Sequence, residues 1–242
     1  MTLSSAEKVY QAIRNKILKG EFPAGSPLRA SALARDFGWG LTPIREGLTR
    51  LLSEKLVQVA FNSGFAVTAI SSEELTDLGA VRALIETEML DLAIRNGDED
   101  WEGRVVAAAY QLNRVPVPNL AMDEDGLTRW EIRHQGFHDA LVSAGTSEWL
   151  IHLRSQIDAQ LQLYHRNILL GLREAAQTQT QIIAEVDQLL AQCMGAQGHT
   201  DLMEAALERR TDEALALFRT HAALSLQCYS QLQNMMIEHK AA

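Results

Sequence analysis

Cysteine is scarce in this chain, with only Cys193 and Cys228 among 242 residues. Two cysteines cannot build the set of bridges that stabilises small secreted scaffolds, so the sequence excludes that class and favours a reducing compartment. No uninterrupted apolar run approaches the length of a membrane span, so we expect no membrane partner. No charged segment followed by an apolar one opens the chain, so we expect no secretory signal and a cytoplasmic location.

Charge of the two signs is unevenly distributed along the chain. The whole sequence carries a formal net charge of −9, yet residues 1–70 hold nine Lys and Arg against five Asp and Glu, which is +4, and the remainder carries −13. A basic segment joined to an acidic one is the asymmetry expected when only the first segment meets nucleic acid. The length is enough for one large domain or two modest ones.

The first seventy residues read as short helices followed by a hairpin. The spacing of apolar residues predicts a helix that ends at Gly20, a second over 31–37 and a third over about 42–54. Residues 57–61 and 65–69 then flank Asn62-Ser63-Gly64, which predicts a β-hairpin with a glycine at a position of positive φ. This is the layout of a winged helix-turn-helix, which places its third helix in the DNA major groove and a β-wing beside it.

Beyond residue 70 the pattern contains helices only. Ser71-Ser72-Glu73-Glu74 is a capping box that opens a long helix, and Asn96-Gly97 closes it. Further helices are expected over about 100–113, 124–144, 147–170, 173–193, 199–208 and 211–238. We therefore expect a mostly α protein, with a winged helix-turn-helix domain over 1–70 and an all-α antiparallel helix bundle over 71–242.

Several motifs, in this order, resemble a known family. The first seventy positions resemble GntR-type bacterial regulators through Gly20…Pro23-Ala24-Gly25, Pro43-Ile44-Arg45-Glu46-x-Leu48 and Asn62-x-Gly64-Phe65-x-Val67. The rest resembles the FCD effector domain of the FadR-like branch through Asp77-Leu78-x3-Arg82-x3-Glu86, Phe137-His138-x2-Leu141 and His199-x5-Ala205-x8-Ala214-x6-His221. The resemblance implies a ligand-responsive transcriptional regulator, expected to be a repressor, that binds a pseudo-palindromic double-stranded DNA operator as a homodimer.

The candidate DNA-binding residues lie on the third helix and at the hairpin tip. A guanidinium at Arg45 can fork onto a phosphate or onto guanine, and its alternative is an ion pair within the helix. Thr42 can both cap the helix and touch a DNA backbone or base, and its alternative is capping alone. Arg50 either reaches phosphate or stays solvated. Asn62 and Gly64 resemble the family's wing tip, although a plain hairpin needs the same residues. Leu41 departs from the family pattern, because it cannot donate a hydrogen bond and could instead contact a thymine methyl.

Two of the seven histidines, His134 and His138, are four residues apart on one expected helix, so they share a face and can grip one divalent metal. The resemblance implies that His199 and His221 complete the metal site. The family more often carries Asp or Asn at position 134. Four imidazoles move the expected preference from oxygen-loving ions to zinc, nickel or copper, with zinc first on availability. The alternative to metal binding, for each histidine, is a structural role as a core residue with one hydrogen bond.

Arg82 stands where the family's arginine faces the metal cavity. A fixed cation beside an open coordination position would trap a small carboxylic acid, which is the effector that we expect. The alternative is an i,i+4 ion pair with Glu86 on the helix surface. The resemblance places Tyr164 and Arg166 near the same effector pocket.

Two other classes of function remain open at the sequence level. One is a metal-dependent enzyme that uses the histidines, but four protein ligands would close a tetrahedral site and no His-Glu-x-x-His motif is present, so we expect no enzyme. The other is a DNA-binding regulator whose metal is purely structural, or is itself the signal. A rise in melting temperature when a small carboxylic acid is added would distinguish a regulator controlled by that acid from these two alternatives.

Overall fold

The structure is a computed structural model that describes residues 4–60 and 64–240. Contacts divide the chain into two compact units, which are described separately below. The head unit consists of Met1–Leu78 together with Gln156–Gly171, and the bundle unit consists of Gly79–Ser155 together with Leu172–Ala242. Within the described residues no helix is long and apolar enough to cross a membrane.

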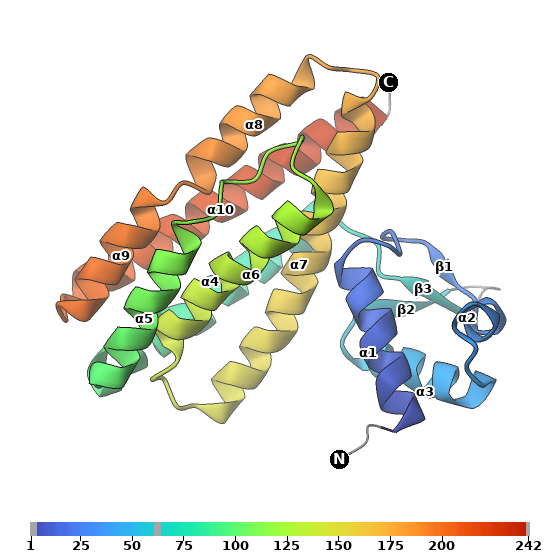
Figure 1. The fold of residues 1–242 in the computed structure, drawn as a ribbon, viewed down its shortest axis with the longest axis horizontal. Coiled ribbons are helices and arrows are strands. Elements are labelled where there is room, and N and C mark those ends of the chain that lie inside the picture. Colours follow the sequence, from blue (N-terminus) through green and yellow to red (C-terminus); the bar gives the residue numbers. More distant parts are fainter. Residues whose placement is uncertain (1–3, 61–63, 241–242) are drawn as a thin grey trace. The chain divides into compact units, whose positions relative to one another are not determined.

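The first part of the head unit, up to Val67, combines three helices with a small sheet in the residues that the structure describes (Figure 1). Its elements are α1 (Ser5–Leu18), β1 (Pro27–Leu28), α2 (Ala30–Phe37), α3 (Leu41–Ser53), β2 (Val57–Ala60) and β3 (Gly64–Val67). The strands are antiparallel in the order β1-β3-β2. Gly38 ends α2 with φ 68°, and Gly64 starts β3 with φ 82°, so glycine stands where the backbone turns left-handed. The winged helix-turn-helix predicted from the sequence is present.

Two details of the head differ from the prediction, and one predicted residue cannot be compared with the structure. The two-residue strand β1 was not expected, because two residues carry no periodicity; it exists only through pairing with β3. Helix α3 starts at Leu41, with Gly40 as an N-cap that offers no side-chain bond. The expectation that Thr42 caps this helix is therefore wrong, because Thr42 already lies inside the first turn. Asn62 lies outside the described residues.

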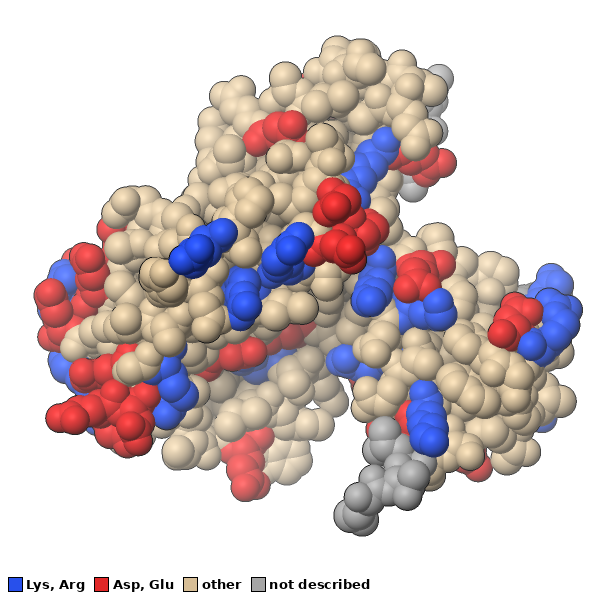
Figure 2. Space-filling view, viewed as in Figure 1, with Lys and Arg blue, Asp and Glu red and all other residues tan. Residues whose placement is uncertain are grey.

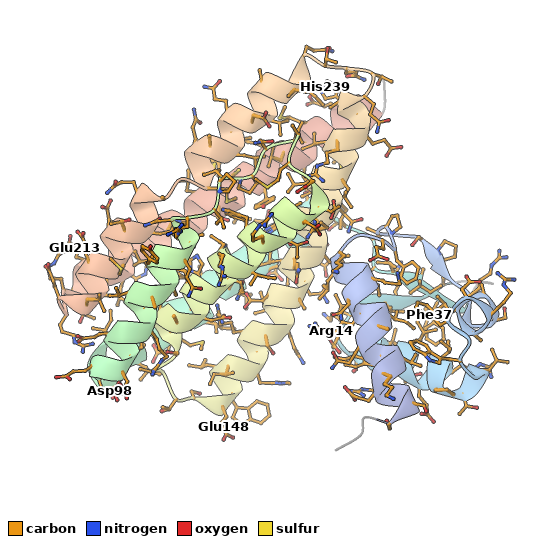
Figure 3. All side chains as sticks on the ribbon, viewed as in Figure 1. Arg14, Phe37, Asp98, Glu148, Glu213 and His239 are labelled. Atoms are coloured by element: carbon orange, nitrogen blue, oxygen red, sulfur yellow. The ribbon has the colours of Figure 1, made fainter. Side chains whose placement is uncertain are left out.

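The rest of the chain is built from helices, and side chains cap the starts of α4, α5, α6 and α7. The helices that follow the head's strands are α4 (Ser72–Asn96), α5 (Glu99–Leu112), α6 (Glu124–Val142), α7 (Glu148–Ala176), α8 (Ile182–Cys193), α9 (Gln197–Leu207) and α10 (Thr211–Lys240). Ser71 Oγ accepts from the backbone N–H of Glu74 at 3.1 Å, which confirms the predicted N-terminal cap of α4. Asp98, labelled at the start of α5 in Figure 3, caps that helix through Trp101 N–H at 2.8 Å.

Two neighbouring helix boundaries were predicted wrongly, the end of one helix at 170 and the start of the next at 173, since α8 begins only at Ile182. Gly171 was expected to end a helix, but α7 continues through it to Ala176. Leu169 and Leu172, on either side of this glycine, are buried. Their packing outweighs the roughly 1 kcal/mol that a glycine costs inside a helix relative to alanine.

The core of the bundle unit is apolar, and its surface gathers acids in places. Trp101, Phe137 and Phe218 are almost fully buried in one continuous cluster, and the Trp101 indole N–H donates to the Ala140 carbonyl at 3.1 Å. Figure 2 shows red acidic side chains collected around the start of α5, whose first turn carries Glu99, Asp100 and Glu102. Such acids stabilise a helix N-terminus and would repel phosphate, so this surface is unsuited to DNA.

Candidate functional sites: an exposed helix and a histidine cluster

Helix α3 docks by one face and presents the other. Ile44, Leu48 and Leu51 are fully buried on the inner face, where Gly47 allows close approach to α1. Arg45 lies on the exposed face, and Leu41 keeps 49% of its surface exposed at the start of the helix. A helix held in this way presents its N-terminal half as a groove-reading helix does.

Arg50 is engaged within the head unit. Its Nη1 lies 2.5 Å from a Glu7 carboxylate oxygen, and its guanidinium carbon lies 3.9 Å from the centroid of the Tyr10 ring. The hydrogen bond from Arg50 lowers the pKa of the Glu7 carboxyl and raises that of the guanidinium. A DNA phosphate bound by Arg50 would therefore compete with Glu7 for its guanidinium. Arg45, in contrast, is exposed to solvent.

Four histidines from three helices meet in the bundle unit. His134 and His138 come from α6, His199 from α9 and His221 from α10, and one ring nitrogen of each lies within 4.8 Å of the others. The Nε2 atoms of His134 and His138 are 3.3 Å apart. Two nitrogens bound to a tetrahedral zinc at 2.0–2.1 Å would be separated by about 3.3 Å. The set could therefore hold a metal ion.

Hydrogen bonding leaves one nitrogen of His199 free for a ligand. Its Nδ1 lies 3.2 Å from the Gly195 carbonyl oxygen, and since a carbonyl only accepts, Nδ1 carries the proton. Its Nε2 is buried and has no hydrogen-bond partner among the described residues. The same is true of Nδ1 of His138. A backbone carbonyl on one ring nitrogen is the usual way in which a protein orients a metal-ligating imidazole.

The pKa values of three of these histidines, His138, His199 and His221, are lowered so that the rings stay neutral. Burial, aided by neighbouring charges, lowers the pKa of His138 well below its ordinary 6.5. Burial, His199 and the Arg82 guanidinium lower the pKa of His221 to about 3, and burial lowers that of His199. Neutral imidazole is the form that binds metal, so the donor set fits a divalent transition metal.

Arg82 forms the predicted ion pair with Glu86, but not on the surface. Glu86 is 1% exposed, with one carboxylate oxygen 3.1 Å from Arg82 Nε and the other 2.5 Å from Arg154 Nε. Arg154 also binds Asp139, the neighbour of His138, at 2.6 Å. The charge of Arg82 lowers the pKa of both His138 and His221, which places this cation in the electrostatic field of the cluster.

Tyr164 and Arg166 belong to the head unit rather than to the bundle unit that holds the histidines. The Tyr164 hydroxyl accepts from the Ser71 N–H at 3.1 Å and donates to a Glu74 carboxylate oxygen at 2.5 Å. Burial and the Glu74 carboxylate raise the pKa of Tyr164 to about 12. Arg166 is fully buried. The contacts of Tyr164 named here lie within the head unit. The expected role of Tyr164 and Arg166 in binding an effector stays a prediction.

Sequence reasoning missed three participants in the histidine site. Trp130 stacks on His134 with ring centroids 4.6 Å apart, Arg154 shares the Glu86 carboxylate, and the Gly195 carbonyl orients His199. Trp130 lies one helical turn before His134, so the i,i+4 spacing was a usable signal. The sequence carries no such signal for Arg154 or Gly195, because their contacts cross between helices or arise in a loop.

Known protein families match both parts of the chain. Residues 5–67 match the family of bacterial regulatory proteins named gntR, and residues 77–224 match the FCD domain. The HTH-type transcriptional repressor GlaR of Escherichia coli K12 is 32% identical over 91% of this chain and 93% of its own length. The HTH-type transcriptional regulator BphR of Paraburkholderia xenovorans LB400 is 31% identical over 85% of this chain and 83% of its own.

Solved structures share the fold. The Escherichia coli protein McbR/YncC superposes with a TM-score of 0.68 at 18% identity, covering 95% of this chain and 99% of its own. A GntR regulator from Rhodococcus sp. RHA1 superposes with a TM-score of 0.67 at 18% identity, covering 99% of each chain. These two solved structures therefore share the overall fold of this chain. The chain belongs to the GntR family of bacterial regulatory proteins, as a transcriptional regulator with an FCD domain.

Proposed function

We propose that this regulator is a repressor that binds a pseudo-palindromic operator as a homodimer, and that a small organic acid bound beside a divalent metal controls it. The observation that carries the proposal is the four-histidine cluster in the same unit as Arg82, in a chain whose head presents a DNA-reading helix. Similarity to a protein named as a repressor supports repression. A two-fold dimer matches a two-fold operator.

The metal would be held by His134, His138, His199 and His221. It would supply a Lewis-acidic centre for one carboxylate oxygen of the acid. The chain's own residues provide the rest. Burial keeps the imidazoles of His138 and His221 neutral, and the Gly195 carbonyl fixes the ring of His199. Trp130 stacks on the ring of His134. A four-nitrogen tetrahedral site is closed, so binding an acid oxygen requires a fifth ligand position or release of one histidine.

Metal content is the first test of the proposal. Elemental analysis of purified protein should give about one equivalent of a transition metal in the wild type and none in His221→Ala. His152→Ala, which changes a histidine outside the cluster, should keep the metal. A wild type that takes up no metal even after reloading with zinc would sink the metal-dependent part of the proposal.

Arg82 is the proposed partner of the acid. Its guanidinium already pairs with Glu86, and a second carboxylate would compete for the same fork. A carboxylic acid that binds the metal-loaded fold should raise its melting temperature, since a ligand that binds only the folded state stabilises it. Arg82→Lys should reduce that shift, because lysine lacks the planar fork. A metal that is only structural, or is itself the signal, predicts no shift with any acid.

Arg45 tests the DNA-binding half independently of the metal. We expect Arg45→Ala to weaken operator binding by about 1–3 kcal/mol if the side chain reads a base. Loss of a phosphate contact alone would instead lower the salt slope by about one unit. Arg219→Ala, on the exposed face of α10, is the matched control. Unchanged affinity of the Arg45 variant across a salt series would remove this residue from the interface.

A further inference from the structure

The middle of α7 is part of the head unit, although α7 lies within the sequence that matches the FCD domain. Ala159 and Leu163 are buried in the same apolar cluster as the core residues of α1 and α3. Figure 1 shows α7 as one continuous helix. The head therefore contains a helix from far along the chain, which the domain boundary at residue 70 did not anticipate.

Three polar side chains on this stretch of α7 bond to backbone groups of the head. Gln160 Nε2 donates to the Glu54 carbonyl at 2.5 Å. The Tyr164 hydroxyl accepts from Ser71 N–H at 3.1 Å, and Asn167 Oδ1 accepts from Ala24 N–H at 2.8 Å. The spacing of i, i+4 and i+7 puts all three on one helical face. Each bond satisfies a backbone group at the end of a helix or in a turn, where no regular ladder does so.

Of these contacts, the one made by Gln160 reaches the DNA-reading helix. Glu54 is the residue that terminates α3, and the chain then turns left-handed at Lys55 with φ 57°. The Glu54 carboxylate is also held from α1, by the Tyr10 hydroxyl at 2.5 Å and by Arg14 Nε at 2.9 Å. Arg14 is labelled on α1 in Figure 3. The C-terminal end of α3 is thus fixed from α1 and from α7.

The orientation of the Gln160 amide is determined by its partner. A carbonyl can only accept, so the NH2 group faces Glu54. Gln160 is 5% exposed, and its Oε1 is buried with no hydrogen-bond partner among the described residues. A buried acceptor left in this way costs about 1–3 kcal/mol, which an apolar residue at this position would avoid. The amide is therefore an expensive means of holding the helix end.

We infer that Gln160 is a positioning residue for DNA recognition: by anchoring the Glu54 carbonyl, it fixes the tilt at which α3 presents Arg45 to the major groove. Arg45 lies nine residues before Glu54, about 13.5 Å along the helix axis. A small displacement of the anchored end therefore moves the reading end relative to the bases. The inference rests on the DNA-reading role of α3. Gln160 itself does not touch DNA.

The test compares Gln160→Met with Gln162→Met in the full-length protein. Methionine keeps the length and helix preference of glutamine but cannot donate to the carbonyl. The probes are a duplex recovered by in vitro selection with the wild type and a scrambled duplex of the same length. We expect Gln160→Met to lose roughly tenfold in affinity for the selected duplex and little for the scrambled one, because phosphate contacts tolerate tilt better than base contacts do. Gln162→Met should keep the wild-type ratio of the two affinities.

Melting temperatures separate positioning from simple loss of stability. If both affinities of Gln160→Met fall together with its melting temperature, or if the ratio stays at the wild-type value, the inference is overturned. If Gln160→Met does not fold, Gln160→Ala is measured well below its own melting temperature and judged by the same ratio. If the wild type selects no duplex at all, the DNA-binding proposal fails and takes this inference with it. If the wild type selects a duplex but the Gln160 variants keep its ratio of selected to scrambled affinity, only the inference about Gln160 is overturned, and the DNA-binding proposal stands.

Discussion

The Nε2 atoms of His134 and His138 face each other at 3.3 Å across one turn of α6. That separation matches the about 3.3 Å edge of a tetrahedral nitrogen site, so these two nitrogens are spaced as two ligands of one metal ion would be. Position 134 is also where the family resemblance leads us to expect Asp or Asn, and this chain carries histidine there. The identity of this residue should therefore decide which metal the site prefers.

We predict that His134→Asp shifts the site toward oxygen-loving ions. Carboxylate suits manganese and magnesium, whereas imidazole suits zinc, nickel and copper. Zinc affinity should fall at least by the roughly tenfold to hundredfold that is typical for losing even an outer-shell partner. Metal content measured after equilibration with equal zinc and manganese checks this. A zinc share unchanged from the wild type would mean that His134 is not a ligand.

The Trp130 indole provides an optical signal for the same site. It stacks on the His134 ring with 4.6 Å between centroids and 15° between planes. A copper ion at the cluster should quench this indole strongly, because an open d-shell a few ångströms from an excited ring offers a fast decay route. Titration with Cu²⁺ should quench the wild type but leave Trp130→Phe much less affected. Trp149→Phe removes a 75% exposed indole and should keep the quenching, so equal loss in the two variants would contradict the placement.

Acid should destabilise the metal-free protein through the same histidines. In the fold the pKa of His221 is lowered to about 3, and those of His138 and His199 lie below 6.5. The unfolded chain binds protons near pH 6.5, where the folded chain does not, so the free energy of unfolding falls as pH drops below that value. His221 alone accounts for on the order of 2 kcal/mol at pH 5.

Thermal unfolding in a chelator between pH 8 and pH 5 measures this effect. His221→Gln removes one titrating group and should flatten the pH dependence of the melting temperature. An equally steep fall in this variant would assign the acid sensitivity to other groups. Metal-loaded protein should resist acid until protons displace the metal from the imidazoles.

The sequence predicted elements far better than it predicted the contacts between them. The head helices and the cap at Ser71 followed from periodicity and local side-chain chemistry, which act within a few residues. Gly171 led to a wrong helix end, because the helix propensity of a glycine is a local property, whereas the burial of Leu169 and Leu172 depends on tertiary packing. The pair His134 and His138 is visible in the spacing of one helix. Bringing His199 and His221 beside them, and Arg154 onto Glu86, depends on helix packing, which no single segment encodes.

The buried carboxylate of Glu86 should be a point of high stability cost. It is the shared partner of two arginines, Arg82 and Arg154, inside the bundle unit. Glu86→Gln would leave two guanidinium groups with an uncharged partner, and breaking a buried pair in this way costs about 3–5 kcal/mol. Urea unfolding of Glu86→Gln beside the exposed control Glu88→Gln measures it. A difference below about 1 kcal/mol between the two variants would show that Arg154 finds enough compensation in Asp139.

Close packing of α1 on α3 makes a final prediction, about two glycines inside helices. A Cβ at Gly47 would lie 2.9 Å from Val9 Cγ1 and 3.2 Å from the Tyr10 backbone nitrogen, so Gly47→Ala must push the helices apart. Overpacking of this kind costs about 1–3 kcal/mol and would move the helix that carries Arg45. A Cβ at Gly103 in α5 meets nothing within 4 Å, so Gly103→Ala should stabilise by about 0.5–1 kcal/mol. Opposite shifts in melting temperature are the expected result; a stabilised Gly47→Ala would mean that α1 and α3 pack less tightly than their backbone separation indicates.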